Sequence, residues 1–192
     1  MQETRSGEGV VFLDLENYDY FCRYDPNAGA NADLPSGDRA DSVPPIENTC
    51  SESSWRSVGA PRPAVRAIDL VQFTLALAQS AIQYRHRKVA DLILIGQTLR
   101  VKGRSHYTAP QAAKIFKSLL PLLPVRPQCL FEAFFLLHFL ARYGHRKSWI
   151  FGAHLFPFRA HCWIAEDDVL LNESPHRIEG YQVILTAEPT AS

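Results

Sequence analysis

Three residue types that together can break an acyl bond appear in this chain in the order cysteine, histidine, carboxylate. Cys129 opens a long apolar run, His161 alternates with apolar residues on a predicted strand, and Glu173 follows the next strand. A thiolate is a strong nucleophile, an imidazole can take up and return a proton, and a third group can orient the imidazole. The pattern therefore predicts covalent catalysis, with Cys129 as nucleophile, His161 as general base, and Glu173 or Asn172 as the group that orients the imidazole.

Cys129 lies at the start of the strongest predicted helix, residues 128–142, with Pro127 just before it and Gly144 as the residue that ends it. Backbone N–H groups at a helix N-terminus lower the pKa of a thiol. The alternative is an inert core cysteine, because free cysteine is among the most buried residue types.

The base has a rival. His161 shares a strand face with Trp163, two residues on, whereas His154 ends the preceding predicted strand. We expect His161 to be the base. The other histidines considered are predicted on the wrong side of the helix or in loops (His138, His145, His176).

The third member stays open between Glu173 and Asn172. A hairpin turning near Asp167 and Asp168 would bring residues 172 and 173 back towards His161, which favours them over Glu166 and the two turn aspartates.

The other cysteines carry no motif. Cys162 is expected in the core, on the strand face opposite His161, and Cys22 and Cys50 have no motif spacing. We find no phosphate-binding or dinucleotide-binding motif and expect neither cofactor nor metal, since a zinc site from Cys129, His154 and His161 would lack a recognisable spacing.

The predicted elements give an α+β fold in which helices pack on an antiparallel sheet. Helices are expected at residues 64–84, 111–120 and 128–142, and strands at 148–155, 160–165, 169–171 and 181–185. Residues 91–99 fit a helix or a strand.

The N-terminal part differs in composition. Residues 10–15 and 18–24 predict a hairpin, and residues 25–63 are poor in large apolar side chains. We expect a small β-rich module over residues 1–58 and a second domain over 59–192, with the boundary between residues 45 and 63.

Composition sets limits on function. The chain is 46% hydrophobic and 21% charged, with 20 basic and 20 acidic residues, which gives no support to nucleic-acid binding. No apolar run is long enough for a membrane span, and the polar N-terminus with unpaired cysteines leads us to expect a cytoplasmic protein.

The motifs Cys129-Leu-Phe-Glu-Ala, Pro157-Phe158-Arg-Ala-His161-Cys-Trp163 and Asn172-Glu173-Ser174-Pro175 together resemble the B2 peptidase of lasso-peptide biosynthesis. This resemblance, over residues 64–192, implies a transglutaminase-like cysteine peptidase fold, with the nucleophile at Cys129 and the base at His161. The family's acid, normally aspartate, falls on Glu173, which is one methylene longer.

The segment Gly9–Phe21 resembles the opening strands of the leader-recognition module (RRE, B1). Together the two resemblances imply a protein of the RiPP class that binds the leader of a precursor peptide and removes it, before an asparagine-synthetase-like cyclase closes the macrolactam. Two alternatives stay open: a non-catalytic leader-binding scaffold, and an acyl-transferring transglutaminase.

Overall fold

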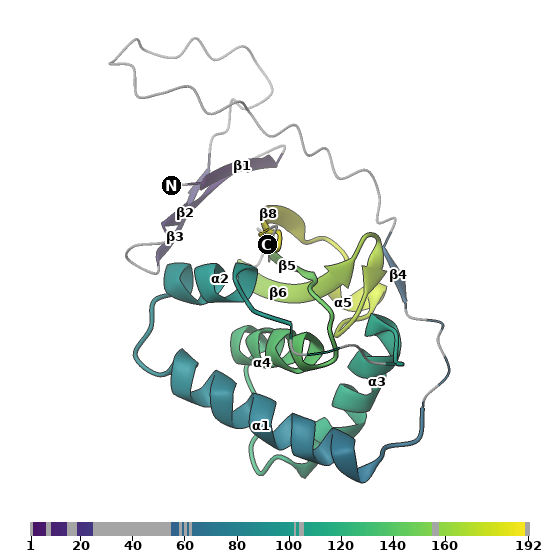
Figure 1. The fold of residues 1–192 in the computed structure, drawn as a ribbon. Coiled ribbons are helices and arrows are strands. Elements are labelled where there is room, and N and C mark those ends of the chain that lie inside the picture. Colours follow the sequence, from purple (N-terminus) through teal and green to yellow (C-terminus); the bar gives the residue numbers. More distant parts are fainter. Residues whose placement is uncertain are drawn as a thin grey trace.

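The computed structural model describes residues 55–190, apart from 58, 60, 62, 102, 104, 105 and 155–157, and the backbone pairing of three N-terminal strands. Within these residues the chain forms a five-stranded sheet with helices packed against it (Figure 1). This is the α+β arrangement that the sequence predicts. No described helix has both the length and the apolar character that a membrane span requires.

The sheet has the strand order β4-β7-β6-β5-β8. Its strands are β4 (Arg56–Ser57), β5 (Ser148–His154), β6 (Arg159–Glu166), β7 (Val169–Leu170) and β8 (Gln182–Ala187). The prediction of an antiparallel sheet is wrong in one respect, because β4 pairs with β7 in parallel and the sheet is mixed. This short strand is held by side chains that no periodicity reveals: Trp55 packs edge-on against Trp163, and Arg56 pairs with Asp168.

Helix α4 (Cys129–Arg142) is the centre of the domain. It lies between the sheet and α1 (Ala67–Tyr84) (Figure 1). Helix α2 (Val89–Gln97) packs against both α4 and β8. Helix α3 (Ala109–Leu119) packs against α4 and α1 and continues into a short 3-10 turn at Leu120–Leu122. Every residue of α4 from Ala133 to Ala141 is buried. A helix that is apolar on all sides is expected in such a buried position. The packing of α4 against β6 places the N-terminus of the helix beside that strand.

Local signals explain where the helices begin and end. Thr108 caps α3, accepting a hydrogen bond from the backbone N–H of Gln111. Gly144 follows α4 with φ of 85°, the left-handed conformation expected of a residue that ends a helix. Residues 91–99, which the sequence left undecided, are largely helical in α2, where Asp91 accepts a hydrogen bond from the backbone N–H of Lys88.

The N-terminal strands β1 (Gln2–Ser6), β2 (Gly9–Asp14) and β3 (Asp19–Tyr24) form an antiparallel sheet in the order β1-β2-β3. The predicted hairpin corresponds to β2 and β3, while β1 was not anticipated. Residues 25–54, with Cys50, lie outside the described residues, as does the side chain of Cys22. Most of the region between residues 45 and 63, where the sequence predicts a domain boundary, therefore also lies outside the described residues.

Candidate active site

Cys129 is the first residue of α4. Its neighbour Gln128 is the extended N-cap residue (φ −69°, ψ 156°), and its side chain makes no capping hydrogen bond. The first-turn N–H groups of a helix have no partner within the helix, and together they carry a partial positive charge. Because Cys129 is the first residue of the helix, its side chain lies close to this positive charge. Cys129 is only half-buried, so it remains accessible.

His161 and Glu173 form a hydrogen-bonded pair beside Cys129. The imidazole Nε2 of His161 lies 2.8 Å from Oε1 of Glu173, and the two side chains are only 15% and 8% exposed. Since Nε2 is taken by the carboxylate, Nδ1 is the nitrogen left for the thiol, and a hydrogen bond joins Cys129 to His161. The structure therefore brings together the three residues that the sequence singled out.

Hydrogen bonds shift the titration of all three groups. Hydrogen bonds from Cys162 and then His161 lower the pKa of Cys129 from 9.0 to about 4, although burial opposes the shift. Hydrogen bonds to Cys129 and then Glu173 raise the pKa of His161 from 6.5 to about 9. Burial raises the pKa of Glu173, but His161 outweighs it and leaves that pKa lowered. Between about pH 4 and 9 the pair is therefore thiolate and imidazolium.

A tight hairpin positions Glu173. The chain reverses at Asp167, whose φ is 53°, and the backbone N–H of Leu171 bonds to the carbonyl of Ile164 at 2.9 Å. Buried Asn172 then accepts a hydrogen bond from the N–H of Ile164 at 2.8 Å. Asn172 thus fixes the backbone of β6, and its neighbour Glu173 contacts His161.

The remaining carboxylates near the hairpin have other partners. Asp168 pairs with Arg56, and Glu166 pairs with Lys147 on the neighbouring part of the sheet. These two carboxylates therefore bind basic side chains of neighbouring segments and do not contact the imidazole of His161. Of the carboxylates that the sequence left as alternatives, Glu173 is the one in contact with His161.

Cys162 lies in the core as predicted, and it also contacts Cys129. Its side chain is buried in the core between the sheet and α4, as expected for a residue on the face of β6 opposite His161. Its thiol nevertheless hydrogen-bonds to Cys129, as does its backbone N–H. The sequence does not reveal this contact, which arises because the N-terminus of α4 reaches the edge of β6, where the consecutive residues His161 and Cys162 both contact the sulfur of Cys129.

Aromatic rings surround the imidazole. The ring centroids of Trp163 and Tyr181 lie 6.2 and 5.8 Å from that of His161, and His154 packs against the far side of this group, 5.7 Å from Tyr181. His161, rather than the rival His154, is the imidazole hydrogen-bonded to Cys129. The other histidines have different settings, with His145 bonded to the carbonyl of Tyr107 and His176 in the short helix α5 (Pro175–Ile178).

Gly152 makes room for Trp163. Gly152 pairs with His161 across β5 and β6, and a Cβ atom at this position would lie 2.7 Å from Trp163 Cη2 and 3.2 Å from the carbonyl oxygen of Gln182. A side chain would therefore displace the indole that flanks the imidazole. The absence of a side chain at position 152 is part of what holds His161 in place.

Sequence reasoning missed Glu132. It lies one turn after Cys129, on the same side of α4, and burial followed by the charge of Glu173 raises its pKa. The three-residue spacing from Cys129 was the available signal. Among the described residues no group of three or more His, Cys, Asp or Glu side chains is arranged to hold a metal ion.

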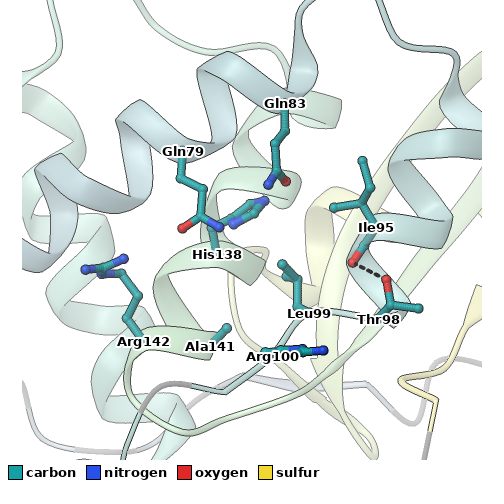
Figure 2. A pocket seen from close by; sticks show the side chains of 9 residues that line it. All are labelled: Gln79, Gln83, Ile95, Thr98, Leu99, Arg100, His138, Ala141 and Arg142. Carbon is teal, nitrogen blue, oxygen red and sulfur yellow. Dashed lines mark hydrogen bonds between the residues drawn. The ribbon is translucent and has the colours of Figure 1, made fainter.

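A separate pocket of about 300 Å³ lies at the other end of α4. Figure 2 shows the side chains that line it: two glutamines of α1, four residues at and after the end of α2, and three residues of α4 (Gln79, Gln83, Ile95, Thr98, Leu99, Arg100, His138, Ala141 and Arg142). Ala141 is twelve residues after Cys129, roughly 18 Å along the helix axis. This pocket is therefore not the place where Cys129 meets a substrate.

The candidate site thus consists of a cysteine at the start of a buried helix, an imidazole on the adjoining strand β6 and a carboxylate in the segment after β7. Residues 73–186, more than half of the chain, match the transglutaminase-like superfamily. The chain belongs to the transglutaminase-like superfamily. This superfamily includes both cysteine peptidases and acyltransferases. No curated protein and no solved structure matches the chain.

Proposed function

We propose that this transglutaminase-like protein is a cysteine peptidase that removes the leader from a lasso-peptide precursor, with Cys129, His161 and Glu173 as its catalytic residues. The observation that supports the chemistry best is the continuous hydrogen-bonded chain from Cys129 through His161 to Glu173. The lasso-peptide substrate rests on the motifs around these residues and on their resemblance to B2 peptidases.

In the proposed reaction the Cys129 thiolate attacks the carbonyl carbon of the leader–core peptide bond and forms a tetrahedral oxyanion. The His161 imidazolium then protonates the departing amine, and the C–N bond breaks to leave a thioester on Cys129. His161, now neutral, takes a proton from water. The resulting hydroxide equivalent attacks the thioester, releases the leader carboxylate, and restores the thiolate and imidazolium.

The oxyanion needs hydrogen-bond donors close to Cys129. The backbone N–H of Cys129 is unpaired within the helix because it belongs to the first turn. A second donor would come from the exposed side chain of Gln128, which makes no capping bond. Both would lie on the open side of the sulfur.

Leader capture would use the N-terminal sheet. In the order β1-β2-β3 the strands β1 and β3 are edges, so an extended leader can add a strand there and be held close to the peptidase site. An asparagine-synthetase-like cyclase in the cytoplasm would then use the freed core peptide.

The test is to incubate the protein with a candidate precursor peptide, taken from any short reading frame found beside the gene, and to follow cleavage by mass spectrometry. We expect the wild-type protein to release the leader, Cys129→Ala to release none while still binding the leader, and Cys162→Ser to retain most activity. Added hydroxylamine distinguishes hydrolysis from acyl transfer, because an acyltransferase would give mainly the hydroxamate. Cleavage by Cys129→Ala would show that the nucleophile is assigned to the wrong residue.

A further inference from the structure

The outer side of α1 is apolar along its whole length. Its inner side is buried through Asp69, Phe73, Ala76 and Ser80 and packs against α4. Large hydrophobic side chains on the outer side are spaced by three, four and seven residues, with Leu70 beside them. All five remain strongly exposed (Ile68 53%, Val71 51%, Leu75 46%, Ile82 76%, Leu70 42%). We call these five residues the α1 stripe.

No charge interrupts the α1 stripe. The other exposed residues of α1 are Ala67, Thr74, Ala78 and Ala81. The helix has one charged residue, Asp69, which is buried on the inner side, where it accepts hydrogen bonds from the Tyr143 hydroxyl at 2.6 Å and the Arg66 backbone N–H at 2.8 Å. The outer face of a surface helix normally carries charged and polar side chains, and an exposed apolar patch of this kind marks an interaction site.

The charges at both ends of the α1 stripe are positive. Arg66 is exposed just before the helix, and Arg85, His86, Arg87 and Lys88 are exposed just after it. The next acidic residue, Asp91, is occupied in capping α2. The surface thus combines an uncharged apolar centre with basic ends, although the chain as a whole carries no net charge.

We propose that α1 is a docking surface for an anionic lipid bilayer. The α1 stripe would enter the boundary between headgroups and acyl chains, and the arginines at its ends would bind lipid phosphates, because long cationic side chains reach from apolar surroundings to polar headgroups. Figure 1 shows α1 as an outer helix on the side of α4 away from the sheet. Its eighteen residues make it roughly 27 Å long, so it can lie flat on a membrane surface.

Two other occupants fit less well. A second copy would bring basic ends together whether the two α1 helices ran parallel or antiparallel, and like charges oppose such contacts. A partner helix would normally be held in register by charged residues flanking the apolar seam. Here the flanking exposed positions are alanine and threonine, which set no register.

The proposal is independent of the peptidase assignment. The α1 stripe faces away from α4, whereas Cys129 lies where α4 meets β6. Membrane attachment of this kind needs no spanning helix, because the bound helix lies in the plane of the interface.

The experiment is flotation of the full chain with vesicles of phosphatidylcholine alone or with about 30 mol% phosphatidylglycerol, a content chosen to give the surface negative charge. We expect the wild type to float with the anionic vesicles and to be released by high salt. Ile82→Asp, and separately Arg85→Glu with Arg87→Glu, should each reduce partitioning about tenfold or more. The matched control Leu94→Asp, on α2 and 59% exposed, should float like the wild type.

Circular dichroism would establish that the variants are folded, and Leu75→Gln provides a milder second variant of the α1 stripe. The proposal is overturned if the wild type floats with neither vesicle, or if Ile82→Asp and Leu75→Gln float as well as the wild type. It is also overturned if sedimentation shows a lipid-free dimer that Ile82→Asp dissociates, because a second copy would then cover this face.

Discussion

The two ends of α4 are built for different purposes. At its N-terminus, Cys129 is half-buried and touches two groups that shift its titration, His161 and Cys162. At its C-terminus, Tyr143 is buried and donates a hydrogen bond to the buried carboxylate of Asp69 at 2.6 Å. The buried middle of the helix thus connects an accessible end, at Cys129, to a buried end, at Tyr143, which we call the closed end. Changes at the first end should therefore impair chemistry, and changes at the second should impair stability.

The largest effect, after loss of the nucleophile, is expected at Glu173. Glu173→Gln keeps the size of the side chain but removes the charge that raises the pKa of His161. We expect kcat to fall about 10²-fold, within the range of contributions from proton-transfer groups. The thermal midpoint should change little. Glu173→Asp should be more active than Glu173→Gln, because it keeps the carboxylate. The measurement is kcat from steady-state cleavage assays, and an unchanged kcat in Glu173→Gln would show that the carboxylate is not required.

An intermediate effect on both properties is expected at Gly152. In Gly152→Val the added atoms collide with Trp163 and with the backbone at Gln182, and overpacking of this kind costs about 1–3 kcal/mol. Because Trp163 flanks His161, activity should fall at temperatures where the protein is still folded. Urea unfolding and cleavage assays on the same sample separate the two effects. Normal activity in a destabilised Gly152→Val would show that the indole does not position the imidazole.

The smallest effect on chemistry is expected at the closed end of the helix. Tyr143→Phe leaves a buried carboxylate oxygen of Asp69 without its hydroxyl donor, which costs about 1–3 kcal/mol of unfolding free energy. The activity of the folded protein should be unchanged, since Tyr143 is a helix length away from Cys129. Chemical denaturation measures the first quantity, and kcat per folded molecule measures the second. A large loss of kcat would remove the contrast between the two ends.

Much of the site was predictable because each residue carries a local signal. Cys129 precedes an apolar helix, His161 sits on an alternating strand, and the turn at Asp167 determines which later residues return to His161. The choice between Asn172 and Glu173 was not predictable from the residues alone, because both follow β7 in a segment with no regular periodicity to fix the direction of their side chains. The structure places Asn172 on the backbone of Ile164 and Glu173 on the imidazole.

What the sequence could not reveal depends on contacts between distant segments. The parallel pairing of β4 with β7 rests on Arg56 meeting Asp168, 112 residues away. The contact between Cys129 and Cys162 depends on where a helix end meets a strand edge, which periodicity does not encode. The exposure of the α1 stripe was not predictable either, because the identity of an apolar side chain does not reveal whether it faces the interior or the surface.

The central claim, that Cys129 is a thiolate paired with His161, is tested most directly by the pH dependence of its alkylation. The rate of Cys129 carboxamidomethylation by iodoacetamide should be measured from about pH 3 to 10 by mass spectrometry, which distinguishes it from the buried Cys162. A depressed thiol pKa means that the reactive form is lost only as the pH falls through about 4, so we predict a rate that is nearly constant from about pH 5 to 8. A rate that instead rises with an apparent pKa near 9, unaffected by His161→Ala, would contradict the account.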